Sequence, residues 1–291
     1  MKKTSFATLM AVCLLPASAI AKDHSKSDHA SDHISDQVIA EQRQMLASNT
    51  VGKGFGPQSP RDLASIAGTN QRTFGMAPAA SEMSLCNIHF HKNAEHKGGE
   101  FATYAGNGDG KGYQTGFVYS GQLTSSELRP TNNATCPDKQ GGLVPGDTIE
   151  LHYVYSSAQT QPGATLGACL SDSTMNPHLR VEAQVFVLVN DKKAGNFAEL
   201  AKHDMSNGLP QAVNIPTDTG SPIVYAGSTT GPAYNEKASP LQVTWSVRPR
   251  VAKVDIATVG EWCKDNVFNE DHAHGVRNLV TNPDLLSEIE S

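Results

Sequence analysis

The sequence has no long hydrophobic run, no basic patch and no pair of cysteines in C-x-x-C spacing. Its one short apolar stretch, near the N-terminus, is far below the ~20 residues that a membrane-spanning helix needs. The 29 Asp and Glu outnumber the 23 Lys and Arg, and the resulting formal net charge of −6 argues against a nucleic-acid partner. The absence of C-x-x-C pairs argues against a thiolate zinc site and against a dithiol redox motif.

Glycine and proline are plentiful instead, with 25 Gly and 16 Pro among 291 residues, and 38% of the residues are hydrophobic. This composition can form a sizeable core, and the many turn residues favour short strands over a helical bundle. Strands are expected at 86–91, 100–104, 115–120, 148–155, 180–189, 222–226 and 241–247. Helices are expected at 34–48, 192–204 and 256–264. We find no internal repeat, so we predict one mainly β domain around a central twisted sheet, with a few peripheral helices.

The N-terminus has the pattern of a secretory signal peptide. Two lysines precede the short apolar stretch, and Ala19-Ile20-Ala21 forms an A-x-A-like cleavage site. The mature protein is therefore expected to be periplasmic or secreted, without a membrane span. The predicted segments are a signal peptide at 1–21, a polar, histidine-containing tail with a short helix at 22–50, and the main domain at 51–291.

Four cysteines remain in the mature chain: Cys86, Cys136, Cys169 and Cys263. An even number in an exported protein predicts disulfide bonds, and four cysteines allow three pairings. We favour Cys136 with Cys169, because both lie in loops that flank one predicted strand. Cys86 would then pair with Cys263 and join the C-terminal segment to the core.

The first group of chemically active residues lies at 86–96, which reads Cys-Asn-Ile-His-Phe-His-Lys-Asn-Ala-Glu-His. Side chains alternate between the two faces of a strand, so His89 and His91 point the same way. Two imidazoles on one face can both reach a single metal ion. Asn87 shares that face and could fix the tautomer of a ligand. This pattern predicts metal binding.

A second group lies on the predicted strand 148–155, where Glu150, His152 and Val154 share one face. If this strand is a neighbour of the first one, His152 can join the two imidazoles there. Three histidines with one open position form the usual catalytic arrangement of zinc. Glu150 would then accept a hydrogen bond from a ligand imidazole.

These motifs resemble those of carbonic anhydrases. Residues 89–96 match the H-F-H-x-x-x-E-H segment of the bacterial α-type enzymes, and 150–154 match their E-x-H-x-V strand. Residues 227–232, Gly-Ser-Thr-Thr-Gly-Pro, resemble their G-S-x-T-T-P loop with one residue fewer, and 243–245 resemble the V-T-W that follows it. The long insertion after the first motif and the flanking Cys-Asn-x-His-Phe-His and Trp-Cys segments are more similar to the δ class. The chain therefore resembles a bacterial, exported δ-class carbonic anhydrase over roughly residues 83–282.

The resemblance implies an α-carbonic-anhydrase-like catalytic domain at 51–291. The implied reaction is the zinc-dependent, reversible hydration of CO₂ to bicarbonate and a proton by a metal-bound hydroxide. One Zn²⁺ per chain would be bound by His89, His91 and His152. The side chains of Asn87 and Glu150 would orient the ligand imidazoles.

The resemblance also implies roles around the metal. Thr229 would be the gatekeeper: its hydroxyl would accept a hydrogen bond from the hydroxide and donate one to Glu95. The shortened loop leaves Thr230 as an alternative for this role, and His96 would be structural. An apolar CO₂ pocket would be lined by Val154, Val185 and Trp245. The proton carrier stays open among the tail imidazoles and His178, His203, His272 and His274.

Two other functions fit parts of the sequence. A cupin-type metalloenzyme would use His89, His91 and Glu95 as ligands, with iron or manganese as the more natural metal. The upstream Gly and the Pro-x-Gly-x-x-His motif of cupins are missing, however. A noncatalytic periplasmic zinc-binding module is the second alternative, and it would leave Thr229 and the apolar pocket without a role.

Overall fold

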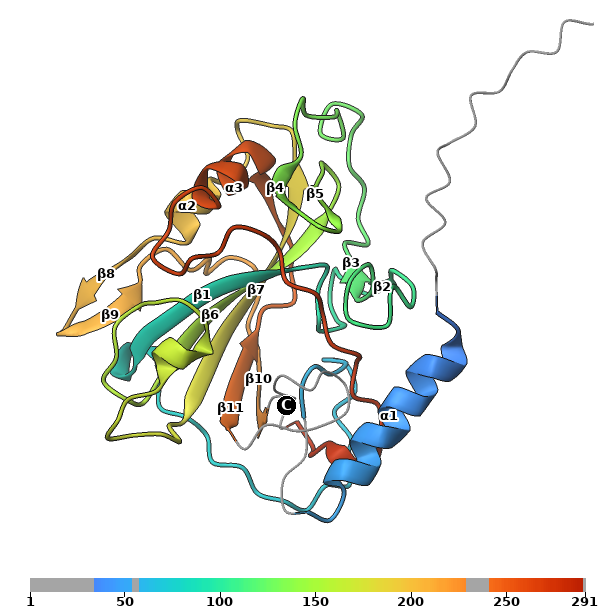
Figure 1. The fold of residues 1–291 in the computed structure, drawn as a ribbon, viewed down its shortest axis with the longest axis vertical. Coiled ribbons are helices and arrows are strands. Elements are labelled where there is room, and N and C mark those ends of the chain that lie inside the picture. The colour runs from blue at the N-terminus through green and yellow to red at the C-terminus, as the bar shows by residue number, and fades with distance from the viewer. Residues whose placement is uncertain (1–33, 54–57, 229–240, 290–291) are drawn as a thin grey trace, which may run out of the picture. The chain divides into compact units, whose positions relative to one another are not determined.

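A mixed, six-stranded sheet forms the centre of the computed structural model, which describes residues 34–53, 58–228 and 241–289 (Figure 1). Its strand order is β1-β6-β7-β11-β10, and β12 pairs with the second half of β7. The β1/β6, β6/β7 and β10/β11 pairs are antiparallel, whereas β11 and β12 run parallel to β7. The strands are β1 (Ser84–Lys92), β6 (Thr148–Ser156), β7 (Leu179–Val189), β10 (Ile223–Ser228), β11 (Gln242–Val247) and β12 (Ala252–Asp255). The mainly β prediction is confirmed.

Shorter elements surround the sheet. Three two-stranded sheets are formed by β2 (Thr103–Tyr104) with β3 (Phe117–Val118), β4 (Thr135–Asp138) with β5 (Gly141–Leu143), and β8 (His203–Ser206) with β9 (Leu209–Ala212). The helices are α1 (Asp36–Thr50), α2 (Phe197–Leu200) and α3 (Ile256–Trp262). Single 3₁₀ turns lie at η1 (Ala80–Glu82), η2 (Leu166–Cys169) and η3 (Pro283–Leu285).

The helix that we predicted at 192–204 is mostly wrong. Only the four residues of α2 are helical, and His203 begins the β8–β9 hairpin. The reason for its early C-terminal end is local: Asn207 and Gly208 both have positive φ angles, 53° and 82°, as the two central residues of a tight hairpin turn require. The Asn-Gly pair is a strong hairpin signal, and it outweighs the helical spacing of the apolar residues before it.

Both faces of the central sheet are buried, because different elements cover them. Phe90 lies between two histidines of β1 and points away from them, into a core with Phe197 of α2 and Trp262 of α3. On the opposite face, Val154 and Trp245 belong to a second core. Every residue of β6 is buried, so its polar side chains must find partners inside the protein.

Two disulfide bonds join Cys86 to Cys169 and Cys136 to Cys263, so the pairing that we favoured is wrong. The segment 157–178 between β6 and β7 folds back over β1 and brings η2 to Cys86. Strand β4 packs against α3, which ends beside Cys263. Neither approach is visible in the sequence, because both depend on how distant segments pack.

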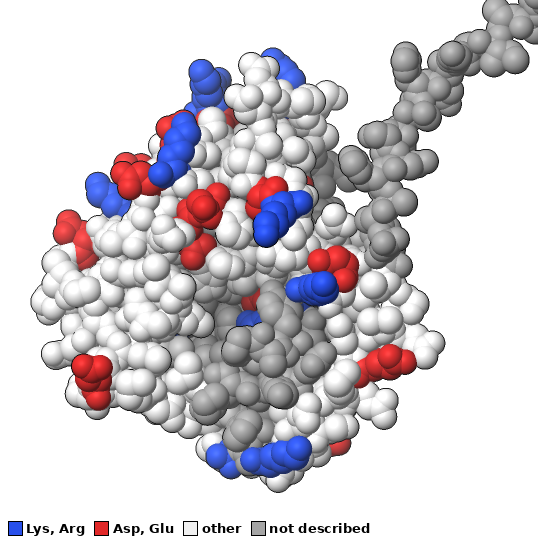
Figure 2. Space-filling view, viewed as in Figure 1, with Lys and Arg blue, Asp and Glu red and all other residues white. Residues whose placement is uncertain are grey.

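Helix α1 lies where the sequence predicts it and packs through Leu46 against Val280, Leu285 and Leu286. The predicted signal peptide lies outside the described residues, and the division between a tail and a domain at residue 50 stays a prediction. None of the described helices is long and apolar enough to cross a membrane. Basic and acidic side chains are interspersed on the face shown in Figure 2.

Candidate metal centre

Three histidines from two neighbouring strands come together on one face of the sheet. In the antiparallel pairing of β1 with β6, His89 lies opposite His152 and His91 lies opposite Glu150. One nitrogen from each of the three imidazoles lies within 4.8 Å of the others, a wider spacing than two ligands of a bound zinc ion have. His152 Nδ1 and His89 Nε2 are 3.3 Å apart, which matches the separation of roughly 3.3–3.4 Å between two ligands of a tetrahedral Zn²⁺.

The second nitrogen of two of these imidazoles is held by a side chain. Asn87 Oδ1 lies 2.6 Å from His89 Nδ1, and Glu150 Oε1 lies 3.1 Å from His152 Nε2. Both contacts fix the N–H of the ring on the outer nitrogen. They leave Nε2 of His89 and Nδ1 of His152 directed toward the shared centre with a free lone pair, as metal binding needs.

The third imidazole is held by the main chain. His91 Nδ1 lies 2.8 Å from the carbonyl oxygen of Gly275, which belongs to the C-terminal segment that runs along β1. The sequence did not predict this contact, since Gly275 lies in irregular structure. With Nε2 of His91 thus facing the centre, all three rings have the tautomer that fits a divalent cation. The donor set fits Zn²⁺.

Burial disfavours the charged form of the two imidazoles on β1. It lowers the pKa of His89 well below its ordinary value of 6.5 and that of His91 to about 4, with neighbouring imidazoles adding to both shifts. Glu150, in contrast, is held in its charged form. Although burial opposes its charge, contacts with His96 and His152 hold the pKa of its carboxyl group well below the usual range. The centre therefore combines two neutral imidazoles, His89 and His91, with a charged acceptor, Glu150.

The metal-free protein is expected to lose stability as the pH falls from about 6.5 to 4. Because His91 has a folded-state pKa of about 4, the unfolded chain binds a proton in this window that the folded chain excludes. The free energy of unfolding should fall by up to about 3 kcal/mol from His91 alone. Urea unfolding of the apo protein between pH 7 and 4 measures this slope. His91→Gln should flatten it, with His89 supplying the remainder; an unchanged slope in His91→Gln would contradict the assignment.

Glu150 connects the two strands to the segment that follows β1. Its Oε2 accepts from the backbone N–H groups of Glu95 (2.6 Å) and His96 (3.2 Å), and its Oε1 lies 2.8 Å from His96 Nδ1. The other ring nitrogen of His96 lies 2.8 Å from the hydroxyl of Tyr225 on β10. His96 is thus fully buried in a structural network and is not part of the imidazole cluster.

Glu95 is fully buried and forms a hydrogen-bonded ion pair with Arg277. The backbone N–H and Nε of Arg277 donate to Glu95 Oε1 at 3.1 and 3.0 Å, and Nη2 donates to Oε2 at 3.0 Å. Although burial opposes its charge, Arg277 and His91 hold the pKa of Glu95 well below the usual range. Sequence reasoning missed Arg277, which lies in the irregular C-terminal segment. Thr229 and Thr230 lie outside the described residues, so the predicted hydrogen bond from Thr229 to Glu95 stays a prediction.

A cavity of about 480 Å³ opens in front of the three imidazoles. Of the three residues predicted for the CO₂ pocket, Val154 and Trp245 line it, whereas Val185 is fully buried opposite Glu150 and is not among the lining residues. The β6/β7 register places Val181 beside Val154, and Val181 lines the cavity instead. The other apolar lining residues are Leu166, Leu170, Leu179, Leu241 and Val243.

The polar wall of the cavity includes His274, one of the imidazoles that the sequence leaves as candidate proton carriers. The ring of His274 lies 5.6 Å from that of His89, and its Nε2 is 2.6 Å from Glu270 Oε2. Although burial opposes the charge, this contact raises the pKa of His274 above 6.5. The ring of His272 lies 5.8 Å from that of His274 and is partly exposed. His178 does not line the cavity.

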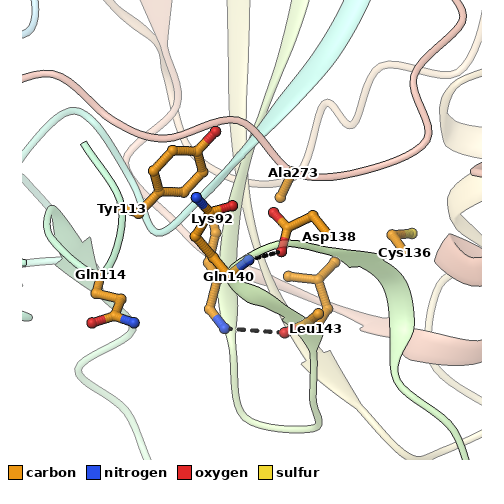
Figure 3. A pocket seen from close by; sticks show the side chains of 9 residues that line it. Lys92, Tyr113, Gln114, Cys136, Asp138, Gln140, Leu143 and Ala273 are labelled. Carbon is orange, nitrogen blue, oxygen red and sulfur yellow. Dashed lines mark hydrogen bonds between the residues drawn. The ribbon is translucent and has the colours of Figure 1, made fainter. Parts of the chain in front are cut away.

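The residue after His91 points to the opposite face of β1. Lys92 pairs with Asp147 at 2.9 Å and donates to the carbonyl of Gly142 at 3.3 Å. It borders a separate cavity of about 60 Å³, together with Tyr113 and other residues drawn in Figure 3. This small cavity has no part in the metal centre.

Comparison with known proteins identifies the family of the chain. A family model described as delta carbonic anhydrase matches residues 80–258, which contain all three clustered histidines. The chain belongs to the δ carbonic anhydrase family. No curated protein matches it. The family match decides against the cupin interpretation, and so does the geometry, since Glu95 is bonded to Arg277 and His152 completes the cluster.

Solved structures of other carbonic anhydrases are weakly similar to this δ carbonic anhydrase. An α-carbonic anhydrase from Photobacterium profundum is 17% identical, with 81% of this chain and 93% of that chain covered and a TM-score of 0.26. A hyperthermostable carbonic anhydrase from a hydrothermal vent chimney is 13% identical, with 85% and 92% covered and a TM-score of 0.29. A sulfanilamide complex of the α-enzyme from Thermovibrio ammonificans is 16% identical, with 77% and 84% covered and a TM-score of 0.25. The assignment rests on the family model.

Proposed function

We propose that this chain catalyses the reversible hydration of CO₂ to bicarbonate and a proton, with one Zn²⁺ held by His89, His91 and His152. One observation carries the proposal. The three imidazoles converge, and the outer nitrogen of each is held by its own acceptor, so three lone pairs face one point. That point borders a cavity that is mostly apolar and can hold CO₂.

The donor set suits a catalytic rather than a structural metal. Three protein ligands leave a fourth position of a tetrahedral ion for water or substrate. A bound Zn²⁺ would supply hydroxide at neutral pH by lowering the pKa of coordinated water to about 7. The residues around it would hold CO₂, orient the attacking group and keep the ligands in place.

Glu95 and Thr229 would provide the orientation. Arg277 keeps Glu95 ionised, so both of its oxygens can only accept hydrogen bonds. If the Thr229 hydroxyl donates to Glu95, its oxygen is left to accept from the group in the cavity. This arrangement would fix the direction of one hydrogen bond at the reacting centre. Thr230 is the alternative donor.

The same proposal includes export from the cytoplasm. Residues 1–21 have the pattern of a signal peptide, and two disulfide bonds are typical of proteins in oxidising compartments. The mature enzyme would then work in the periplasm or outside the cell. Cell fractionation with an antibody against the mature chain tests this part.

The deciding experiment compares metal forms of the purified mature protein in a CO₂ hydration assay. We expect zinc-loaded protein to be active, chelated protein to be inactive, and zinc to restore activity. Tight zinc binding without hydration would favour a noncatalytic zinc-binding module. Tighter binding of iron or manganese than of zinc, with no hydration, would contradict the proposal.

A further inference from the structure

Strand β1 contains a bulge immediately before the metal centre. Leu85 pairs with Tyr155 and Asn87 pairs with Val154, so Cys86 is an extra residue in the ladder. The bulge interrupts the usual alternation. As a result, Cys86 and Asn87 both lie on the side of the imidazoles, whereas Leu85 points into the opposite core.

Both of these neighbours hold the same external segment, 157–178, which joins β6 to β7. Cys86 forms its disulfide with Cys169, and its carbonyl oxygen accepts from the N–H of Gly163 at 3.0 Å. Asn87 Nδ2 donates to the carbonyl oxygen of Gly163, also at 3.0 Å. Asn87 therefore has one end of its amide on this segment and the other on His89 Nδ1.

Besides the disulfide, one buried hydrogen bond holds the segment at Cys169: Ser156 Oγ donates to the carbonyl oxygen of Cys169 at 2.6 Å. Of residues 161–176, all of which the structure describes, only Cys169 is buried. Yet Leu166 and Leu170 form part of the cavity wall. The position of Gly163, and with it the orientation of the Asn87 amide, thus depends strongly on the anchor at Cys169.

We propose that the Cys86–Cys169 disulfide positions the metal ligand His89: it fixes segment 157–178 so that Gly163 holds Asn87 and Asn87 holds the imidazole. The inference rests on the proposed function in taking the three imidazoles as zinc ligands. The contacts of an outer partner usually change metal affinity by about 10–100-fold when they are removed. Removing the disulfide should therefore weaken zinc binding through Asn87, beyond its effect on overall stability.

The second disulfide is a matched control. The two bonds join residues 83 and 127 positions apart, so removing either should lower the thermal midpoint by a similar amount. The zinc dissociation constant is measured on the apo protein by competition with a chromophoric chelator. We expect Cys86→Ala/Cys169→Ala to raise it by about 10–100-fold and Cys136→Ala/Cys263→Ala to raise it by less than about threefold. An equal loss of zinc affinity in both variants would overturn the proposal.

A double-mutant cycle with Asn87→Ala separates positioning from general loosening. Asn87→Ala alone should weaken zinc binding at least about tenfold. In that background, removing the Cys86–Cys169 bond should add less than about threefold, because the connection is already broken. Full additivity would show that the disulfide acts by another route. If the double alanine variant does not fold, Asn87→Ala decides: unchanged zinc affinity overturns the proposal.

The zinc measurement is independent of the CO₂ hydration assay. If the wild-type chain binds zinc tightly without hydrating CO₂, the proposed function fails and the cycle still tests the disulfide. If zinc affinity is insensitive to the disulfide while hydration is normal, only this inference fails. A wild-type chain that does not bind zinc would overturn both.

Discussion

Replacing His152 with alanine is expected to abolish tight zinc binding and CO₂ hydration together. His152 is the ligand contributed by β6, and its Nδ1 lies 3.3 Å from Nε2 of His89. Two imidazoles from one strand would leave an open and weakly held ion. The loss of affinity should exceed the 10–100-fold that outer partners typically cost, because a direct ligand is removed. Zinc content after dialysis and the hydration rate measure the two effects.

His178→Ala is the control for this variant. It removes an imidazole outside both the cluster and the cavity, so zinc content and turnover should stay at the wild-type level. Thermal unfolding of both apo variants shows whether His152→Ala still folds. Full zinc content and full turnover in folded His152→Ala would place the third ligand elsewhere.

Glu95→Gln is expected to lower turnover by roughly 10²-fold while zinc occupancy stays near one per chain, within the range that misaligned acid–base or oxyanion-type groups cost. The amide can donate as well as accept, so the direction of a Thr229 hydrogen bond would no longer be fixed. The substitution also weakens a buried, charge-assisted pair with Arg277, and the thermal midpoint should fall. Zinc content, turnover and unfolding are measured on the same preparation.

A second Glu→Gln change separates the local effect from the loss of an ion pair. Glu182 pairs with Arg180 at 2.6 Å on β7, and both side chains are mostly buried but lie outside the cavity. Glu182→Gln should therefore leave turnover unchanged. Loss of zinc in Glu95→Gln would make Glu95 a ligand, and retention of both zinc and turnover would leave the Glu95–Thr229 pair without a role.

The ligand cluster could be predicted from the sequence because strands have a period of two. His89 and His91 share a face whatever the tertiary structure, and so do Glu150 and His152. The one uncertain step was whether their strands pair, and the β1/β6 register shows that they do. The outer contacts of Asn87 and Glu150 follow from the same alternation.

The partners supplied by the C-terminal segment could not be predicted in this way. Gly275 and Arg277 have no periodic pattern, and they reach His91 and Glu95 only because the chain after α3 runs back along β1. The predicted disulfide pairing was wrong for the same reason. Long-range packing brings η2 and α3 to their partner cysteines. Local patterns determine which face a residue occupies, whereas the order of distant segments is set by the whole core.

The most direct test of the central claim is a zinc titration of the metal-free mature protein, with the CO₂ hydration rate measured at each point. Three converging imidazoles predict a rate that rises linearly and stops rising at one Zn²⁺ per chain. The same titration of His152→Ala should give no comparable rise. A wild-type chain that takes up one zinc with no gain in hydration, or whose rate does not depend on zinc, would contradict the account.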